Sequence, residues 1–233
     1  MTTTASTRHD PAADQPLGQS ECRLYLISPP TFELRLFHAQ LTEALNEADV
    51  ACIQLRMKGV SDDVILGAAE LLMPLAQEFD VPFLINDRPG LAAKADADGV
   101  HIGQEDASYE EARALLGPDS IVGVTCHDSR HLAVIAAEKG ADYVAFGAFF
   151  PTETKQVSSH AHTDLIRWWR DISVVQSVAI GGITPENCTP VVSAGADFVA
   201  VSAGVWNHPE GAGAAVRAYR AAIDRAPMED PVI

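Results

Sequence analysis

Residues 84–106 read LINDRPGLAAKADADGVHIGQED, and this stretch decides the fold. Two short apolar runs, residues 83–85 and 99–102, flank a segment of small residues, and each run gives way abruptly to polar side chains. Runs of this length bounded by turn residues are typical of buried strands. A helix can begin near Arg88 and Pro89, because proline is favoured at the first helical position. The stretch therefore predicts two strands joined by a helix, and we expect the strands to be parallel neighbours.

Two aspartates follow these strands. Asp87 comes directly after the first run, and Asp106 lies a few residues past the second. If the strands are parallel neighbours, both carboxylates emerge at the same edge of the sheet, where they repel each other unless a positive charge lies between them. A Mg²⁺ ion bound by one or two carboxylates, with waters and substrate phosphates, is the usual solution. The alternative is that each aspartate caps the helix that follows it, and these residues alone leave both readings open.

The same alternation of apolar runs and helical spacing continues along the chain, which indicates βα units and a parallel sheet. The runs are residues 23–27, 52–55, 83–85, 99–101, 121–124, 143–146, 178–180 and 198–201. Segments with helical spacing include residues 62–79, 107–116, 130–138, 185–193 and 209–224. Eight such units in about 200 residues are typical of a single (β/α)8 TIM barrel of the α/β class. An open doubly wound sheet is disfavoured because no early G-x-G-x-x-G is present.

The two ends of the chain differ in composition from the rest. Residues 1–21 are polar and contain proline without an apolar core, so we expect a disordered, flexible tail and neither a signal peptide nor a membrane span. We expect the catalytic barrel to occupy residues 22–226 and a C-terminal tail to occupy 227–233. No later apolar run approaches the ~20 residues that a membrane span needs.

Charge and cysteine content restrict the partners. Lys plus Arg number 16 against 32 Asp plus Glu, and the net charge of -16 argues against binding to nucleic acid or to an anionic membrane. A phosphorylated ligand must therefore be held by a local basic cluster or a metal. The 4 cysteines stand far apart without a C-x-x-C pair, so we expect reduced thiols in a cytoplasmic protein.

Three echoes in the sequence mark the opposite end of the barrel. Residues 95–100, 140–144 and 195–199 each place small turn residues and an aspartate directly before a strand. We interpret them as αβ loops, where glycine ends a helix and aspartate begins the turn. Such loops lie on the barrel face away from the chemistry.

Polar residues at the ends of the first strands are candidates for ligand binding. Alternation along an extended strand places Gln54, Arg56 and Lys58 on one side, where they can clamp a phosphorylated ligand, although they can also be simply solvated. Asn86 ends the third run. His127 follows the fifth, and a lone histidine there is more often structural than catalytic.

The later strand ends suggest a second phosphate site. Thr152, Thr154 and Lys155 follow the sixth strand, where two hydroxyls and an ammonium can bind phosphate oxygens and stabilise a departing anion. Glycine-containing turns follow strands seven and eight, at residues 181–183 and 201–204. Barrels commonly bind phosphate there through backbone N–H groups. Two separate anion sites indicate two phosphorylated ligands.

Taken together, these motifs resemble those of the thiamine phosphate synthase family over residues 24–206. The motifs are Q-L-R-x-K at 54–58, I-N-D-R at 85–88, D-G-V-H-I-G-Q-E-D at 98–106, F-P-T-x-T-K at 150–155 and A-I-G-G-I at 179–183. The resemblance implies a Mg²⁺-dependent transferase. It would join hydroxymethylpyrimidine pyrophosphate to thiazole phosphate through a carbocation-like pyrimidine and release pyrophosphate.

The resemblance also assigns roles to residues. Asp87 and Asp106 would hold Mg²⁺ on the pyrophosphate, and Gln54 would contact the pyrimidine. The pyrophosphate oxygens would be bound by Arg56, Lys58, Asn86 and Lys155. The three cationic residues among them would act in catalysis. Near the thiazole ligand would lie Thr152 and Thr154, with Gly182 and Ser202 binding its phosphate through the backbone. Thr125 and Val201 complete the implied substrate-binding set.

Three departures from the family pattern keep two alternatives open. Thr125 stands where the family usually has serine, and residues 156–162 lack the usual glycine-containing loop. Ala148 stands where synthases usually have proline and where the related thiazole tautomerases have a catalytic histidine. The alternatives are a degenerate paralogue that binds a thiamine precursor and a thiazole tautomerase. The oligomeric state is left open, and so is the preference between thiazole phosphate and its carboxylate form.

Overall fold

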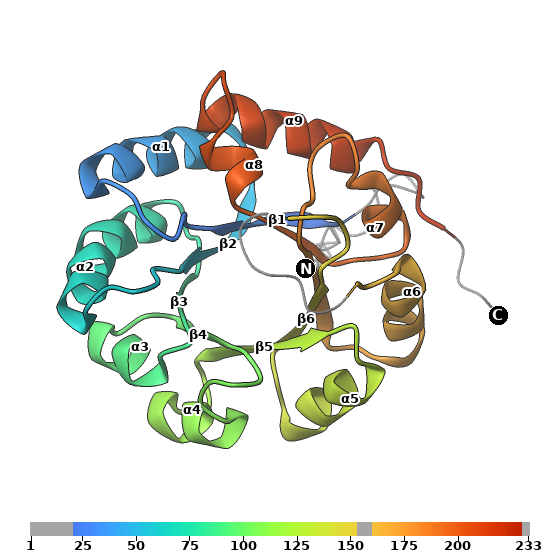
Figure 1. Ribbon diagram of the computed structural model, residues 1–233, viewed down its shortest axis with the longest axis horizontal. Coiled ribbons are helices and arrows are strands. Elements are labelled where there is room, and N and C mark those ends of the chain that lie inside the picture. The colour runs from blue at the N-terminus through green and yellow to red at the C-terminus, as the bar shows by residue number, and fades with distance from the viewer. Residues whose placement is uncertain (1–20, 153–159, 230–233) are drawn as a thin grey trace, which may run out of the picture.

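Eight parallel strands close into a barrel in the order of the chain, with β8 bonded to β1. The structure is a computed structural model that describes residues 21–152 and 160–229. Figure 1 looks along the barrel and shows the helices as an outer ring. The strands are β1 (Arg23–Ile27), β2 (Val50–Leu55), β3 (Phe83–Asn86), β4 (Gly99–Ile102), β5 (Ile121–His127), β6 (Tyr143–Gly147), β7 (Gln176–Ile180) and β8 (Phe198–Val201). The predicted (β/α)8 barrel is confirmed, and every predicted apolar run is a strand.

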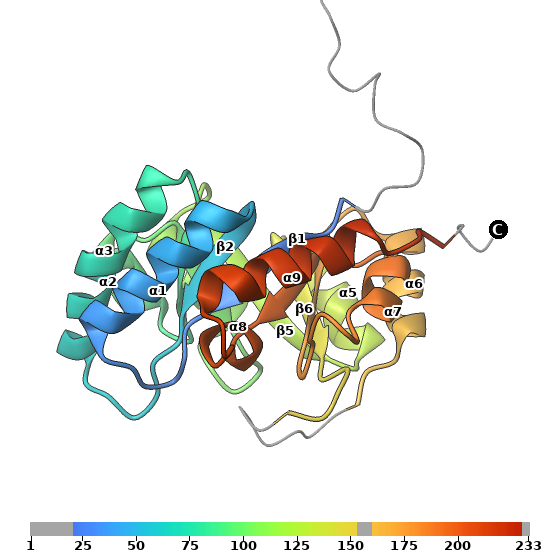
Figure 2. The ribbon, with the colours of Figure 1, turned by 90° about the horizontal axis from the view of Figure 1, so that it is seen from above.

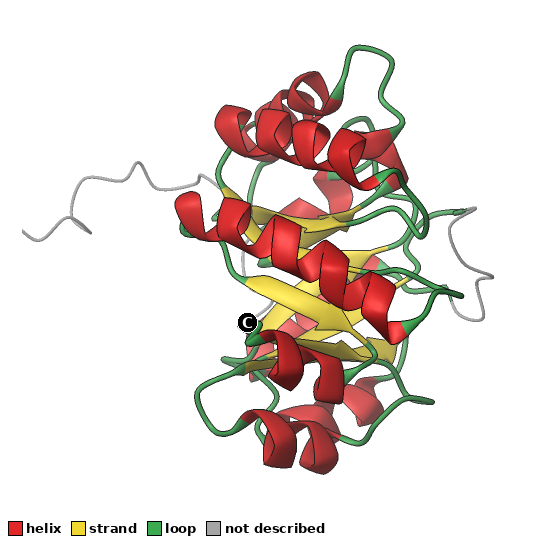
Figure 3. Ribbon diagram, turned by 90° about the vertical axis from the view of Figure 1, so that its left-hand side faces the viewer, coloured by secondary structure: helices red, strands yellow, loops and turns green. Residues whose placement is uncertain are grey.

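Helices cover the outside of the strands, as the side view in Figure 3 shows. They are α1 (Leu34–Glu47), α2 (Asp62–Glu78), α3 (Pro89–Ala95), α4 (Tyr109–Leu116), α5 (Arg130–Lys139), α6 (Thr163–Ile172), α7 (Thr189–Ser193), α8 (Ala203–Trp206) and α9 (Ala212–Asp224). The last helix of the chain, α9, lies beside α1 and so closes the ring (Figures 1 and 2). None of the helices in the described part of the chain is long and apolar enough to cross a membrane.

Two elements differ from the sequence prediction. The helix expected from residue 185 begins only at Thr189, because residues 184–188 form a turn that Asn187 closes. Its Oδ1 accepts from the Thr184 N–H, and its Nδ2 donates to the Gly182 carbonyl. Such side-chain bonds compete with helical hydrogen bonds. The helix expected from residue 209 is preceded by a separate short helix, α8, which follows β8 and lies below the left end of α9 in Figure 2.

Both faces of the strands are buried, which explains why the runs read as continuous apolar segments. Outward side chains such as Leu24 and Ile53 pack beneath the helices in one large core. Inward side chains form a second, smaller core inside the barrel. Its members are Tyr25, Ile27, Cys52, Leu84, Tyr143, Ala145, Val178 and Ala200. Alternation along each strand therefore determines which residues face the barrel interior.

The aspartates of the three sequence echoes tie the amino ends of neighbouring strands together. Asp98 Oδ2 accepts from the Phe83 N–H, and Asp142 Oδ2 accepts from the Val122 N–H, each at 2.7 Å. Asp197 Oδ2 accepts from the N–H of Ser177 at 2.7 Å and from its hydroxyl at 3.0 Å. The interpretation of these residues as structural turns at the end away from the chemistry is confirmed.

The predicted tails lie mostly outside the described residues, at 1–20 and 230–233. Residues 227–229 are described, and the Glu229 N–H donates to the Ser193 carbonyl at 3.0 Å. The Glu229 carboxylate pairs with Arg167. The start of the predicted C-terminal tail is therefore bound to the barrel.

Candidate active site

The carboxyl ends of β3 and β4 bring Asp87 and Asp106 into direct contact, as the sequence predicted. Asp87 has a left-handed backbone, with φ 64°, and its N–H donates to the His101 carbonyl at 2.7 Å. Asp106 Oδ2 accepts from the Gly103 N–H at 2.9 Å. These two hydrogen bonds hold the loops that carry the carboxyl groups. The two carboxyl groups are thereby kept facing each other.

The alternative helix-capping role is wrong for both aspartates. The N-cap of α3 is Arg88, and its side chain makes no capping bond. The N-cap of α4 is Ser108, which forms a capping box with Glu111. Neither carboxylate caps a helix, and both are left to face each other at the carboxyl end of the barrel.

The pKa values of the two carboxyl groups are shifted in opposite directions. Burial by itself raises the pKa of Asp87, but hydrogen bonds with Lys58 and Asp106 outweigh it and leave this pKa below its ordinary value. Burial raises the pKa of Asp106, and the neighbouring Asp87 carboxylate raises it further. A proton is therefore held more tightly than usual at Asp106, which is the response expected of two like charges without a sufficient counter-ion.

The two carboxylates fit a hard cation that takes only a few of its ligands from the protein. Among residues 21–152 and 160–229, no group of three or more His, Cys, Asp or Glu side chains is placed to hold a metal. Asp87 and Asp106 would thus supply two carboxylates and leave most positions to other ligands. Mg²⁺ commonly binds in this way, keeping waters and taking substrate phosphates as ligands.

Basic groups from the end of β2 lie on the same side. Lys58 Nζ donates to Asp87 Oδ2 at 2.9 Å, with the lysine side chain 50% exposed and the aspartate 19%. Burial lowers the pKa of Arg56, while the charge of Asp87 opposes that effect. The guanidinium nevertheless stays charged. Asn86, the last residue of β3, is half-buried next to this group. This part of the site can hold a polyanion.

Gln54 and Thr125 belong to the barrel interior. Gln54 is only 2% exposed, and its Nε2 donates to the Tyr25 hydroxyl at 3.0 Å. Thr125 lies on β5, with Oγ1 2.7 Å from His101 Nε2. The register between β5 and β6 shifts between Thr125 and His127, and such irregularities often re-aim side chains beside active sites.

The turn after β7 contributes backbone groups to the opposite side of this face. Gly181 and Gly182 have φ of 100° and 63°, a conformation that favours glycine. A Cβ on Gly182 would lie 2.2 Å from the Pro151 carbonyl oxygen, so the turn after β7 packs tightly under the loop after β6. Thr152 lies in that loop and is half-buried.

The predicted residues after β8 lie next to the Gly181–Gly182 turn, because β7 and β8 are paired. Val201 is 3% exposed at the end of β8. Ser202 follows as the N-cap of α8, and its Oγ donates to the Ser28 carbonyl at 3.3 Å. Thr154 and Lys155, the remaining predicted site residues, lie outside the described residues and stay predictions.

Three interior residues were missed by the sequence reasoning: Tyr25, Tyr143 and His101. All three are inward-facing on their strands and hydrogen-bonded to one another or to the predicted residues. Strand alternation could have placed them inside the barrel. It could not reveal that side chains from five different strands meet there.

Comparisons with known proteins agree with this architecture. The family model for thiamine monophosphate synthase matches residues 24–205. A thiamine-phosphate synthase of Rhodospirillum centenum is 58% identical over 197 residues, covering 84% of this chain and 95% of that protein. One from Hyphomonas neptunium is 48% identical over 207 residues, covering 87% and 94%. The solved structure of thiamine phosphate pyrophosphorylase from Pyrococcus furiosus has a TM-score of 0.76 at 30% identity, covering 89% of this chain and 98% of that one.

Proposed function

The chain belongs to the thiamine monophosphate synthase family and is a transferase, and we propose that it joins hydroxymethylpyrimidine pyrophosphate to thiazole phosphate. The C–O bond between the pyrimidine methylene and pyrophosphate breaks, and the thiazole nitrogen forms the new bond to that carbon. The products are thiamine phosphate and pyrophosphate. The direct contact between Asp87 and Asp106, with Lys58 on Asp87, is the observation that carries this proposal.

The first part of the proposal concerns the leaving group. Asp87 and Asp106 would hold Mg²⁺ against the pyrophosphate, where the ion supplies positive charge as negative charge develops on the departing oxygen. Arg56 and Lys58 bind the same oxygens from the end of β2, and Asn86 donates to them from β3. Lys155, outside the described residues, is assigned the same role by the family motif. Fixed positive charge of this kind stabilises a dissociative transition state.

The second part concerns the two organic groups. Gln54 and Thr125 contact the pyrimidine from the barrel interior. Thr152 would lie near the thiazole, and the family motif assigns the same role to Thr154, which is outside the described residues. The backbone of Gly182, Val201 and Ser202 would bind the thiazole phosphate. No general base is needed, because the thiazole nitrogen carries its own electron pair.

The cellular location is proposed on chemical grounds. Cys52, Cys126 and Cys188 are buried free thiols. Burial raises the pKa of Cys126 to about 12, so this thiol is unreactive at neutral pH. Unreactive, reduced thiols support a cytoplasmic protein.

The proposal is tested by mixing the purified chain with both substrates and Mg²⁺ and measuring thiamine phosphate and pyrophosphate together. We expect the two products in equal amounts. The Rhodospirillum centenum synthase assayed in parallel is the positive control. If it turns over while this chain yields neither product, the proposal is wrong.

The same assay separates the two alternatives. The departure in residues 156–162 motivates a binding paralogue, which would bind the precursors without releasing pyrophosphate. A tautomerase would instead aromatise the thiazole carboxylate phosphate without any pyrimidine substrate. Ala148 disfavours the tautomerase, since its methyl group packs against Gly181 and offers no acid or base.

A further inference from the structure

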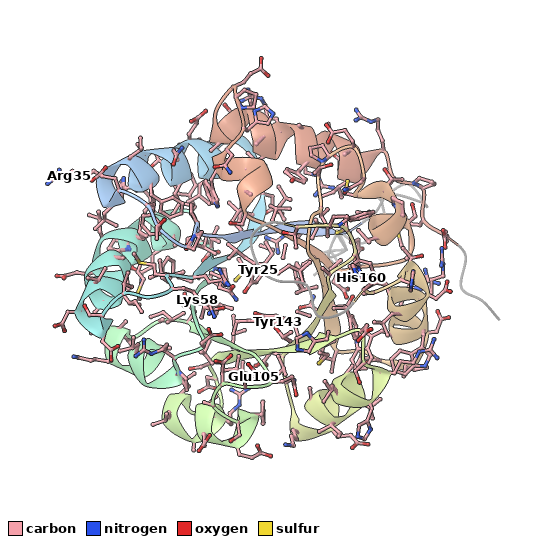
Figure 4. The ribbon with its side chains drawn as sticks, in the orientation of Figure 1. Tyr25, Arg35, Lys58, Glu105, Tyr143 and His160 are labelled. Carbon is pink, nitrogen blue, oxygen red and sulfur yellow. The ribbon has the colours of Figure 1, made fainter. Side chains whose placement is uncertain are left out.

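A chain of hydrogen bonds crosses the interior of the barrel and ends at two proposed substrate contacts. Gln54 Nε2 donates to the Tyr25 hydroxyl at 3.0 Å, and that hydroxyl lies 2.8 Å from the Tyr143 hydroxyl. The Tyr143 hydroxyl lies 2.8 Å from His101 Nδ1, and His101 Nε2 lies 2.7 Å from Thr125 Oγ1. Figure 4 shows Tyr25 and Tyr143 near the centre of the ring of strands. The chain joins side chains of β2, β1, β6, β4 and β5.

This chain is buried and closely packed. Tyr25, Tyr143 and His101 are 3%, 6% and 8% exposed. The His101 and Tyr143 rings stack at 17°, and the Tyr25 ring meets Tyr143 edge-on. Within the described ranges, Ser193 Oγ is the one buried side-chain polar atom without a partner. The interior network is therefore satisfied, as a buried network must be to avoid a large desolvation cost.

The backbone makes room for the middle of the chain. Gly123 lies on β5 opposite Tyr143, and a Cβ there would lie 1.9 Å from the Tyr143 ring. Glycine inside a strand weakens it, and it often marks a close approach of another group. Glycine at 123 thus leaves space for the Tyr143 ring. A larger residue would favour the strand but would collide with that ring.

We propose that Tyr25, Tyr143 and His101 are positioning residues for the pyrimidine substrate, an inference that rests on the proposed function. Phenylalanine at positions 25 and 143 would fill nearly the same space as the two tyrosine rings. What the hydroxyls and the imidazole add is a defined orientation for Gln54 at one end of the chain and for Thr125 at the other.

The polarity of the chain follows from counting hydrogens. Each hydroxyl has a single hydrogen, and burial raises the pKa of both tyrosines well above its ordinary value, so both keep that hydrogen. Since Gln54 donates to Tyr25, the Tyr25 hydrogen goes to Tyr143, the other neighbour being the weakly accepting thiol of Cys52.

The same counting fixes the second half of the chain. A neutral imidazole has one N–H, so Tyr143 would then donate to His101 Nδ1, and the imidazole hydrogen would lie on Nε2 and be donated to Thr125. Gln54 Oε1 is left to accept from the substrate, and the Thr125 hydroxyl is left to donate to it. An aminopyrimidine offers an amine hydrogen and ring-nitrogen acceptors, which match these two groups.

Kinetics of Tyr25→Phe and Tyr143→Phe test the proposal, because each change removes a hydroxyl and keeps the ring. We expect KM for the pyrimidine pyrophosphate to rise roughly tenfold in each variant, as for loss of one hydrogen bond. KM for thiazole phosphate should not change. The matched control is Tyr109→Phe, whose hydroxyl bonds the Gly140 carbonyl on the outer helices and should leave both KM values unchanged.

The double variant distinguishes a chain from two separate contacts. If the residues act as one unit, Tyr25→Phe combined with Tyr143→Phe should raise KM for the pyrimidine about as much as either change alone. Multiplied effects would overturn the proposal. An unchanged pyrimidine KM with only a lower melting temperature would also overturn it, because the residues would then serve packing alone.

The tautomer of His101 provides a readout that does not depend on activity. In ¹⁵N–¹H correlation spectra of the folded wild-type chain, the His101 signals are those lost in His101→Gln. We expect hydrogen on Nε2 and none on Nδ1, and loss of this preference in Tyr143→Phe. A hydrogen on Nδ1 in the wild type would overturn the proposed polarity. Absence of turnover in the wild type would instead refute the proposed function, and the spectra separate these two failures.

Discussion

The aspartates at the two ends of this barrel have the same side chain and different surroundings. At the amino ends of the strands, Asp98, Asp142 and Asp197 each accept a backbone N–H from the neighbouring strand at 2.7 Å. At the carboxyl ends, Asp87 and Asp106 face each other, with Lys58 as the adjacent cation. The carboxylates at the amino ends therefore have hydrogen-bond donors from the protein itself, whereas Asp87 and Asp106 repel each other.

The difference shows at which end of the barrel the fold accepts repulsion between carboxylates. Carboxylates that accept buried N–H groups hold strands in register and stabilise the fold. Carboxylates that face each other raise the free energy of the folded chain until a cation joins them. One end of the barrel therefore contributes stability, and the other is arranged for a ligand.

The largest expected effect is on catalysis at the carboxyl end. Asp87→Asn keeps the shape and removes one charge, and we expect pyrophosphate release to fall by roughly 1000-fold or more, since charge stabilisation of the leaving group is lost. The melting temperature should change little, because its ion pair with a half-exposed lysine contributes little stability. Initial rates and calorimetry measure the two quantities. Retained activity in Asp87→Asn would show that the two ends of the barrel do not differ in the proposed way.

The next effect is on stability at the amino end. Asp197→Ala leaves the buried N–H of Ser177 without its partner, which costs about 1–3 kcal/mol. For a chain of this size the melting temperature falls by about 2–4 °C per kcal/mol. The matched control is Asp49→Ala at the same end, where the 65% exposed carboxylate pairs with Arg23 and should matter little. Equal melting temperatures for the two variants, or lost turnover in Asp197→Ala, would contradict the comparison.

The smallest effect is a gain. Asp106→Asn removes the repulsion from Asp87, so without Mg²⁺ the variant should be slightly more stable than the wild type, by a few tenths of a kcal/mol at this solvent-screened site. The variant should also lose the stabilisation that Mg²⁺ with pyrophosphate gives the wild type. Melting curves with and without these ligands measure both effects. A lower melting temperature for the ligand-free variant would show that Asp106 supports the fold.

The difference between wild type and Asp106→Asn should depend on pH. A pKa raised in the folded state contributes stability that is complete below the unfolded value and is lost as pH rises through the folded pKa. The advantage of the variant at neutral pH should therefore shrink as pH falls through the raised pKa of Asp106 toward the ordinary value of 3.8. Melting curves of both proteins in the same acidic buffers measure this trend. A constant difference would contradict the proposed repulsion.

The sequence predicts the barrel well because its strands are buried on both faces and read as apolar runs. It also predicts the contact between Asp87 and Asp106, since residues after neighbouring parallel strands must meet at one edge. The predicted start of α7 was wrong because Asn187 hydrogen-bonds to the local backbone, an effect that hydrophobic periodicity does not report. The chain through Tyr25, Tyr143 and His101 depends on which inward side chains meet across the barrel, and that requires the closed structure.

The most direct test of a cation between Asp87 and Asp106 is pyrophosphate release from both substrates, measured with Mg²⁺, after chelation and after Mg²⁺ is restored. The wild type and Asp197→Ala should lose turnover on chelation and regain it with Mg²⁺, while Asp87→Asn should stay inactive throughout. Turnover by the wild type that persists after chelation, or that survives in Asp87→Asn, would contradict the account.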